Sequence, residues 1–440
     1  KVYTIAGPEF GSEEGKTAII VRSLYGLKSS GAAWRAHMAQ TMYDIGFSPS
    51  KGDPDVWMRP ATKPDGYDYY EYVLIYVDDI LCCSHQASKV METIAKLYRL
   101  KENPETKKAY EKPARYLGAE SKEYQFNDNL GTYWSISAEQ YLKEAIKNVE
   151  AELDKIGMKF NSRVQGPLAC GYKPELDLSP ELDDRKVNYY QNLIGVLRWT
   201  VELGCIDIYY HVAILSRYLA ALREEHLEQA FCIFAYLQQN VSYKLVMDST
   251  CVVWDEKKFP ARNWEDFYPD TKEELPPKMP RPRGKSVQIN CFVDADHAGD
   301  VVSRRSHTGI LLYVNRAPVI WYSKRQNTVE TSTFGSEFIA MKIATEMIEG
   351  LRYKLRMLGV PLDGPANVFE DNQSVINNAS IPESPLKKKH VSICYHRVRE
   401  ACASDTIRIA KEQSESNLAD ILTKNMPRPQ HKILAGMILR

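Results

Sequence analysis

Two adjacent aspartates, Asp78 and Asp79, stand in the middle of the apolar stretch YYEYVLIYVDDILCCS, which runs from Tyr69 to Ser84. Two strand-like runs separated by two residues predict a β-hairpin with the aspartates at its tip. Asp-Asp suits that tip poorly, because the favoured turns take Gly or Asn at positive φ and because neighbouring carboxylates repel. A divalent cation such as Mg²⁺ would remove the repulsion, since it prefers carboxylate oxygens. The alternative is a solvated turn without a function.

The bulk composition restricts the class of protein. With 440 residues, 44% of them hydrophobic, the chain can bury the cores of roughly two to four domains. It contains no apolar run of the roughly 18 residues that a membrane-spanning helix needs. Its nine cysteines form no C-x-x-C pair, which argues against a zinc or disulfide framework and favours a reducing compartment. The start, KVYTIAGPEF, has neither an initiator Met nor the apolar core of a signal peptide, so we expect a fragment or a processed piece.

The formal net charge is zero, but the charge is unevenly distributed. Residues 281–440 contain 23 Lys and Arg against 16 Asp and Glu, a balance of +7, so residues 1–280 keep 34 against 41, a balance of −7. A basic C-terminal part suits a polyanionic partner. Chance variation in solvated surface charge is the alternative.

Hydrophobic periodicity divides the chain further. Residues 13–84 are typical of a mixed α/β piece, residues 85–165 mix helices with short strands, and residues 186–240 are almost wholly helical. Residues 251–286 hold six prolines among charges with little periodicity, which predicts a tether or a surface insertion.

A new pattern begins at Ser286. Three strand-like runs are followed by a long helix over Phe334–Leu358, and then strands alternate with helices up to a last helix over NLADILTK. This order is typical of a mixed sheet covered by helices.

Several motifs resemble those of one family. SLYGLKSSGAAW (Ser23–Trp34) is similar to a signature of copia-type retrotransposon polyproteins, and YVDD between apolar strands resembles the catalytic hairpin of reverse transcriptases. YLGAES (Tyr116–Ser121) resembles that family's primer-grip segment, NLIGVLRWTVELGCIDIYYHVAILSRYL its helical connection and ADILTK its C-terminal ending. The motifs follow the family's order over nearly the whole chain. The chain thus resembles the reverse transcriptase and ribonuclease H portion of a copia-type LTR retrotransposon Pol polyprotein, truncated at its N-terminus.

The resemblance implies a ribonuclease H metal site of four acids: Asp294 in FVDADHAGD, Glu337 in TFGSEFIAMK, Asp371 in FEDNQS and Asp420 in NLADILTK. The local patterns support them. Asp294 and Asp371 end apolar strands, Glu337 heads a helical stripe that should face the sheet and therefore needs a partner, and Asp420 lies where a helix dipole favours negative charge. Scattered surface acids are the alternative. Asp296 is ambiguous, because the family pattern contains it as well.

The resemblance also implies residues that bind nucleic acid. The basic stretch PLKKKHVSICYHRVRE supplies candidates for phosphate contacts, with a basic loop without a fixed partner as the alternative: Lys387, Lys388, Lys389 and His390. The primer-grip segment implies contacts with primer–template nucleic acid through Tyr116, Leu117 and Gly118.

The polymerase part departs from the family pattern. Asp78 and Asp79 would hold metal, and Lys28 and Ser29 would lie at the incoming nucleotide, although the family has Gln in place of Ser29. The family takes a third aspartate from a strand upstream of a segment like VYTIAGPEFG, which here begins the chain, so we expect little primer extension. The loop before Asp420, KEQSESNLAD, also lacks a His. Two interpretations remain: an enzyme with a complete ribonuclease H site, or a decayed or co-opted element that binds nucleic acid without catalysis.

The expected fold class is a multidomain α+β or α/β protein. The expected segments are a partial reverse transcriptase palm (1–120), a thumb-like segment (121–165), a helical connection (166–250), a proline-rich linker (251–286) and a ribonuclease H-like domain (287–440). The expected reaction hydrolyses the RNA strand of RNA–DNA hybrids with Mg²⁺, or Mn²⁺, by a two-metal mechanism. Expected partners are the hybrid, primer–template and, for a complete polymerase, dNTPs, but no membrane. The resemblance implies an intracellular location, in a cytoplasmic virus-like particle or the nucleus.

Overall fold

The computed structural model describes residues 2–21, 26–126, 131–164, 166–386 and 389–440. They form two compact units, which we treat separately. Unit 1 comprises Lys1–Lys112, Pro280–Gly284 and Met357–Gly359, and unit 2 comprises Pro113–Met279, Lys285–Arg356 and Val360–Arg440. The chain is a mixed α/β protein, as expected, whereas the five-segment division stays a prediction.

Unit 1 is built on an antiparallel sheet in the order β3-β4-β5-β6. Its strands are β3 (Ser48–Pro49), β4 (Val56–Thr62), β5 (Asp68–Tyr76) and β6 (Asp79–Cys83). Helices α1 (Ser30–Asp44) and α2 (Ala87–Leu97) cover one face, because Met42 and Ile94 pack against Val73 there. Near the start of the chain, β1 (Val2–Ile5) and β2 (Thr17–Ile20) pair antiparallel, with the 3-10 helix η1 (Pro8–Glu13) between them in sequence.

Unit 2 contains a small antiparallel sheet and a helical region. The sheet has the order β10-β9-β8-β7, with β7 (Arg115–Tyr116), β8 (Ala119–Gln125), β9 (Thr132–Ser137) and β10 (Lys244–Met247). The helices are α3 (Glu139–Lys155), α4 (Asp184–Glu202), α5 (Tyr209–Leu215) and α6 (Glu224–Gln239), with short 3-10 helices η2 (Pro174–Leu176) and η3 (Ile206–Ile208). Leu142, Tyr190 and Phe234 share one buried core, so the helical segment expected over 186–240 is present.

A second sheet of unit 2 has five strands in the order β13-β12-β11-β14-β15. Strands β11 (Ile289–Asp296), β12 (His307–Val314) and β13 (Ala317–Arg325) pair antiparallel, whereas β14 (Ala366–Glu370) and β15 (Ile407–Lys411) add in parallel. This mixed sheet is the one that the order of strand and helix patterns predicts.

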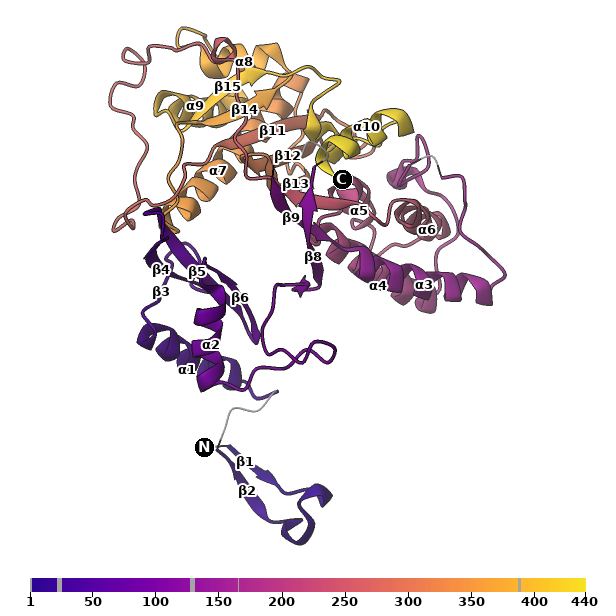
Figure 1. Ribbon diagram of the computed structural model, residues 1–440. Helices are drawn as coiled ribbons and strands as arrows, with labels where there is room; N and C mark the ends of the chain where they lie inside the picture. The colour runs from indigo at the N-terminus through magenta and orange to yellow at the C-terminus, as the bar shows by residue number, and fades with distance from the viewer. Residues whose placement is uncertain (1, 22–25, 127–130, 165, 387–388) are drawn as a thin grey trace. The chain divides into compact units, whose positions relative to one another are not determined.

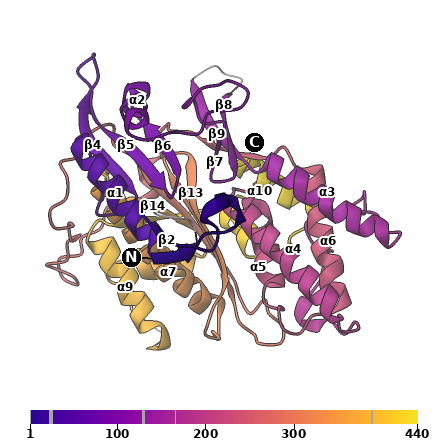
Figure 2. The ribbon, with the colours of Figure 1, turned by 90° about the horizontal axis from the view of Figure 1, so that it is seen from below.

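The two faces of this sheet pack against different elements. Helices α7 (Thr333–Met357), α8 (Gln373–Ser380) and α9 (Ser392–Ala403) cover one face, where Val293 packs with Met341 and Val398 (Figures 1 and 2). The other face holds Leu311 against the 3-10 helix η6 (Leu418–Leu422), α10 (Arg428–Ile438) and part of the helical region. The η5 turn (Lys389–Val391) precedes α9.

Two elements differ from the sequence expectation. The helix expected over NLADILTK is the short 3-10 helix η6, and the last α-helix lies further on, at α10. The proline-rich stretch has little regular structure apart from η4 (Glu256–Lys258), yet Phe259 is buried against Phe369. None of the helices within the described ranges combines the length and the apolar character that a membrane span requires.

Candidate metal centre

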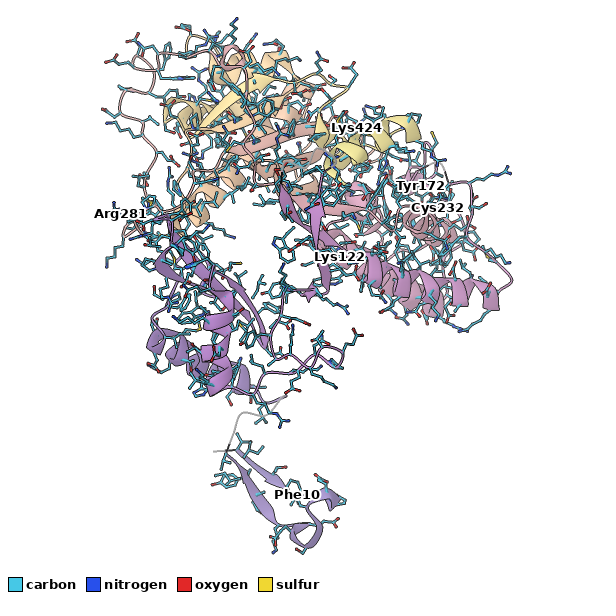
Figure 3. The ribbon with its side chains drawn as sticks, in the orientation of Figure 1. Phe10, Lys122, Tyr172, Cys232, Arg281 and Lys424 are labelled. Carbon is cyan, nitrogen blue, oxygen red and sulfur yellow. The ribbon has the colours of Figure 1, made fainter. Side chains whose placement is uncertain are left out.

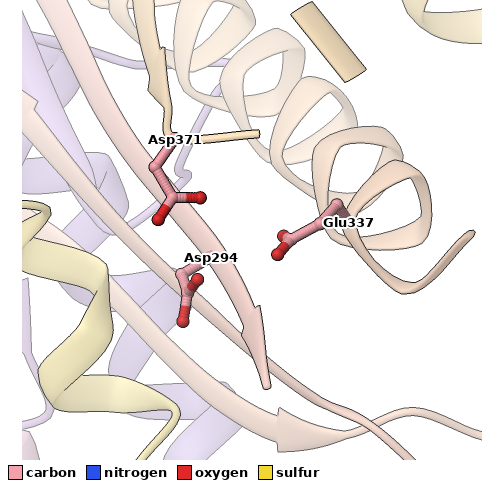
Figure 4. A group of neighbouring side chains, drawn as sticks. All are labelled: Asp294, Glu337 and Asp371. Atoms are coloured by element: carbon pink, nitrogen blue, oxygen red, sulfur yellow. The ribbon is translucent and has the colours of Figure 1, made fainter. Parts of the chain in front are cut away.

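Three of the predicted acids meet at one end of the five-stranded sheet. Asp294 comes from β11, Asp371 directly follows β14, and Glu337 lies in the first turns of α7. Their carboxylate oxygens can all lie within 4.8 Å of one another, and Figure 4 shows the three side chains pointing into one space. The register explains the meeting: Phe292 pairs with Phe369 in the parallel β11–β14 pair, so the acids two residues further on end up side by side.

Burial sets the electrostatics of this cluster. Asp294 and Glu337 are 2% and 3% exposed, and Asp371 is half-buried. One Glu337 oxygen, Oε2, has no hydrogen-bond partner among the described residues. Burial, followed by the neighbouring carboxylates of Glu370, Asp294 and Asp371, raises the pKa of Glu337 well above its usual range. Buried carboxylates that repel one another are the oxygen ligands that a hard divalent cation satisfies.

The fourth predicted acid, Asp420, lies on η6 beside Asp294 but outside the group of three. Its side chain is buried, and burial followed by the charge of Asp294 raises its pKa to about 7. Lys424, labelled in Figure 3, donates to Asp420 Oδ1 over 2.8 Å and lies 3.4 Å from Asp294 Oδ2. The Thr423 hydroxyl also donates to Asp294. Asp294 and Asp420 are therefore linked through a lysine that the motif ADILTK contained but that received no role from the sequence.

Sequence reasoning also missed a fifth acid at the cluster. Glu370, the last residue of β14, is fully buried, and its Oε2 has no hydrogen-bond partner among the described residues. Its Oε1 accepts the backbone N–H of Asn372 over 3.0 Å. Burial and the charge of Asp294 outweigh that bond and raise the pKa of Glu370 well above its usual range. The two adjacent acids in the motif FEDNQS were the signal from which the sequence could have indicated Glu370.

Asp296 was left ambiguous and does not join the group of three. Its carboxylate occupies the space that a Cβ on Gly299 would fill, and it lines a small separate cavity with Tyr172 and Lys173 (Tyr172 is labelled in Figure 3). Burial raises the pKa of Asp296 against the opposing charges of Lys424 and Lys173.

The hairpin of unit 1 has the expected form with a different tip. Tyr76 pairs with Asp79, so the turn is Val77–Asp78 rather than Asp78–Asp79. Val77 has φ 55°, which a β-branched residue rarely adopts, and its carbonyl accepts the Trp34 indole N–H over 2.6 Å. Both aspartates are exposed, and no third acid joins them in a metal-sized group within the described ranges.

The other predicted binding residues are not brought to the acid cluster by any described contact. Lys28 and Ser29 are exposed just before α1, and Leu117 and Gly118 form the tight β7–β8 turn that follows Tyr116, with φ values of 49° and 88°. Lys389 is exposed, and His390 Nε2 lies 3.0 Å from Glu330 Oε2. Lys387 and Lys388 lie outside the described residues. The binding roles of all these residues stay predictions.

Comparisons with known proteins agree with the motifs. No family model matches the chain. A retrovirus-related Pol polyprotein from transposon RE1 of Arabidopsis thaliana is 24% identical over 95% of this chain and 24% of its own length. The Pol polyprotein from transposon TNT 1-94 of Nicotiana tabacum is 25% identical over 95% of this chain and 28% of its own length. The chain thus spans about a quarter of the length of these relatives.

Two of the solved structures that match are distant from this chain. The ribonuclease H1 of Halobacterium salinarum aligns with 31% of this chain and 94% of its own, at 15% identity and a TM-score of 0.25. A foamy viral protease-reverse transcriptase, solved with an RNA/DNA hybrid, aligns with 93% of this chain and 63% of its own, at 13% identity and a TM-score of 0.23. Scores this low do not support a comparison of sites. In sequence, however, the chain is similar over 95% of its length to the Pol polyproteins of copia-type retrotransposons, which confirms the resemblance that its motifs predict.

Proposed function

We propose that unit 2 hydrolyses the RNA strand of RNA–DNA hybrids by a two-metal mechanism. The observation that carries the proposal is the meeting of Asp294, Glu337 and Asp371, from three separate elements, with carboxylate oxygens within 4.8 Å of one another. The similarity to retrovirus-related Pol polyproteins supports a nucleic acid as the substrate. The +7 balance of residues 281–440 supports a polyanion as well.

Mg²⁺ fits this set of ligands, because it prefers carboxylate oxygens and keeps positions open for phosphate oxygens. Bound in a pair, such ions would activate water and stabilise the leaving 3′-oxygen of the RNA. The chain's own residues prepare the site. Thr423 orients Asp294 by a hydrogen bond, and the Lys424 ammonium holds Asp294 and Asp420 beside each other. In this proposal Asp420 would be the fourth carboxylate to hold the metal, since it lies beside Asp294 and shares Lys424 with it.

The test measures cleavage of a hybrid with a labelled RNA strand by the full chain at saturating Mg²⁺. We expect Asp294→Asn to lower the rate by a factor of at least about 100, because a charged ligand becomes a neutral one. Asp363→Asn is the matched control, since Asp363 is an exposed acid of the same unit. Binding of the hybrid without any cleavage by the wild-type chain would instead support the alternative of a decayed or co-opted nucleic-acid-binding element.

A second candidate function concerns the β5–β6 hairpin of unit 1. We infer that Asp78 and Asp79 are part of a DNA polymerase site, and the strained backbone of Val77 beside them is the observation that favours it. Two exposed carboxylates make an incomplete set for two metal ions. Incorporation of dNTPs on a primed template, abolished by Asp78→Asn, would show that the set is complete in this chain, and absence of incorporation is the expected result.

A further inference from the structure

A cavity of about 440 Å³ lies in unit 2 between helices α4 and α5 and the edge strand β13. Its volume falls within the range of small-ligand pockets. Five cationic side chains line it against a single carboxylate, a formal balance of +4: Arg198, Arg217, Arg305, Lys324 and Arg325, with Glu202. The acids of the candidate metal centre are not among its lining residues, and the proposed hydrolysis leaves these cations without a role.

The pairing of these cations leaves a positive excess. The Asp300 carboxylate accepts from both Arg217 (3.4 Å) and Arg325 (2.7 Å) and so balances part of their charge. Arg198, Arg305 and Lys324 make no ion pair with any described residue, and Arg198 and Lys324 are exposed. Three free cations around one cavity attract an anion, and a phosphate is the anion that several Arg and Lys side chains bind together.

A hydrogen-bond chain holds the wall of the cavity in place. Ser323 donates to the Leu422 carbonyl over 2.7 Å, so His307 Nε2 donates to the Ser323 hydroxyl and His307 Nδ1 accepts from Arg217. Burial, with the charges of Arg217 and Arg325, lowers the pKa of His307 well below its usual range, which keeps the ring neutral. Arg217 is therefore fixed as part of the cavity wall.

The lining also contains aromatic and apolar side chains. Tyr209 and Tyr322 line the cavity together with Val201, Val212 and Ala213. Basic side chains beside aromatic rings form the combination that binds single-stranded nucleic acid, in which phosphates contact the cations and unpaired bases stack on the rings. An inorganic anion would use the cations and leave the aromatic wall empty.

The cavity lies near the acid cluster along the sheet. In the strand register Asp294 pairs with Gly309, and Gly309 pairs with Ser323, which lines the cavity. Two strand spacings separate Asp294 from Ser323, roughly 10 Å. A strand whose phosphate lies at the acids can therefore place a nearby nucleotide in the cavity.

We propose that this cavity binds one unpaired nucleotide of a nucleic acid strand, with its phosphate on Arg198, Arg305 and Lys324 and its base against Tyr209 and Tyr322. The site rests on the proposed function in one respect, namely that the same strand reaches the acid cluster. It would hold a single-stranded segment that leaves the hybrid.

The test of this site measures the binding of a labelled ten-nucleotide single-stranded DNA to the full chain. Fluorescence anisotropy gives the Kd, in EDTA and without divalent metal. We expect Arg198→Ala with Lys324→Ala to raise the Kd about tenfold and to reduce the slope of log K against log salt by about 0.7, since the cavity neutralises one phosphate and each neutralised phosphate of a single strand contributes about 0.7. Tyr322→Ala should raise the Kd with little change in slope, because stacking releases no counterions.

The matched control is Lys257→Ala with Lys354→Ala, which removes the same formal charge from exposed positions of unit 2. Lys354 lies 17 residues beyond Glu337 in α7, roughly 25 Å along the helix. Equal losses in the two double variants, or none in the cavity variant, would overturn the proposal. Competition by adenosine monophosphate at the concentration of the oligonucleotide would assign the cavity to a free nucleotide and overturn the strand assignment.

The binding assay separates this inference from the proposed function. Glu337→Gln should bind the oligonucleotide like the wild-type chain, because it leaves the cavity unchanged. If the wild-type chain binds through the cavity but cuts no hybrid, the hydrolysis proposal fails and the nucleotide site stands. If the wild-type chain cuts the hybrid but does not bind the oligonucleotide through the cavity, the hydrolysis proposal stands and the nucleotide site fails.

Discussion

Glu337 combines 3% exposure with a carboxylate oxygen that has no hydrogen-bond partner among the described residues. Its raised pKa means that the folded chain binds a proton more tightly than the unfolded chain, so without metal this group lowers stability as pH rises above its ordinary pKa of about 4.5. We expect Glu337→Gln to raise the metal-free free energy of unfolding at pH 7 by about 1–2 kcal/mol and to abolish most of the stabilisation by Mg²⁺. Thermal melting from pH 5 to 8, with and without Mg²⁺, measures both effects.

Glu346→Gln is the control for that experiment. Glu346 lies on the same helix and pairs with Lys342 at the surface, so its loss should change stability by only a few tenths of a kcal/mol. Stabilisation by Mg²⁺ that persists fully in Glu337→Gln would remove Glu337 from the metal site and contradict the proposed hydrolysis at this cluster.

The sequence predicts the acids of the site better than the residues that surround them. The family resemblance implies Asp294, Glu337 and Asp371, and the strand and helix patterns support them by placing them at the ends of buried faces. Glu370 escapes notice because a single sequence does not show which of two adjacent acids points inward. Lys424 also escapes notice, because lysine is usually exposed and no hydrophobic periodicity marks a residue that follows a short helix. Val77 contradicts the turn rules, since the surrounding hairpin holds it at a φ that its own side chain disfavours.

Among the elements, η6 depends on a glycine of the neighbouring strand. A Cβ on Gly309 would lie 2.6 Å from Thr423 Cγ2, 2.7 Å from the Ala419 carbonyl oxygen and 2.9 Å from Leu422 Cβ. We expect Gly309→Ala to push η6 outward, to lower the free energy of unfolding by about 1–3 kcal/mol and to reduce hybrid cleavage, because Asp420 and Lys424 move with η6. Urea unfolding and cleavage rates measure the two effects.

Gly350→Ala is the matched control for the η6 experiment. A Cβ there meets nothing within 4 Å, and the residue lies within α7, where Ala is the better helix former. Equal stability of Gly309→Ala and the wild-type chain would show that η6 is not seated on this strand as tightly as the distances indicate.

The proline-rich stretch is attached to α7 by one acid. Glu273 accepts from Arg352 and from Arg356, whose side chains are 5% and 14% exposed. Burial opposes ionisation of Glu273, but the two guanidinium groups outweigh it and lower its pKa to about 2. The stabilisation is therefore complete above the unfolded pKa of about 4.5 and is lost as pH falls toward 2.

We expect Glu273→Gln to lower the free energy of unfolding by about 2–3 kcal/mol at pH 7, because two partly buried cations lose their partner. The difference from the wild-type chain should shrink as pH falls from 4.5 to 3.5, as urea unfolding across that range would show. Glu274→Gln, an exposed neighbour, serves as the control. A difference that stays constant over this pH range would mean that the pair is not ionic.

Elements whose hydrophobic residues recur with a strong period match the prediction from the sequence closely, and elements without such a period do not. The long helix expected over Phe334–Leu358 is α7, Thr333–Met357, because a stripe from Met341 to Leu351 marks its buried face. The stretch over 251–286 has no such stripe, so its packing through single residues such as Phe259 and Glu273 has no signal in the pattern. The sequence predicts a helix over NLADILTK without distinguishing an α-helix from the 3-10 helix η6, because the segment has too few apolar residues to show a period.

On the scale of the whole molecule, the candidate sites belong to different units. Unit 1 has its own core around Met42 and Val73 and carries the exposed pair Asp78 and Asp79. Unit 2 carries the buried acids and the cavity. The proposed metal ion at the acid cluster should therefore stabilise unit 2 and leave unit 1 unchanged. Sequence motifs named both sites, but only the contacts show that their cores are separate.

Calorimetry of the full chain tests this division. We expect two unfolding transitions, and Met42→Ala should lower the one of unit 1 whereas Ile348→Ala lowers the one of unit 2, since each removes a fully buried side chain at a cost of about 2–5 kcal/mol. Mg²⁺ at about 100 times its Kd should stabilise unit 2 by about 2.7 kcal/mol and raise its midpoint by roughly 5 °C. Two exposed carboxylates hold Mg²⁺ more weakly than a cluster of two buried carboxylates and a half-buried one that already repel each other, so the unit 1 transition should not move. The unit 1 transition is the one that Met42→Ala lowers. If Mg²⁺ shifts that transition, the stronger metal site lies at the hairpin instead.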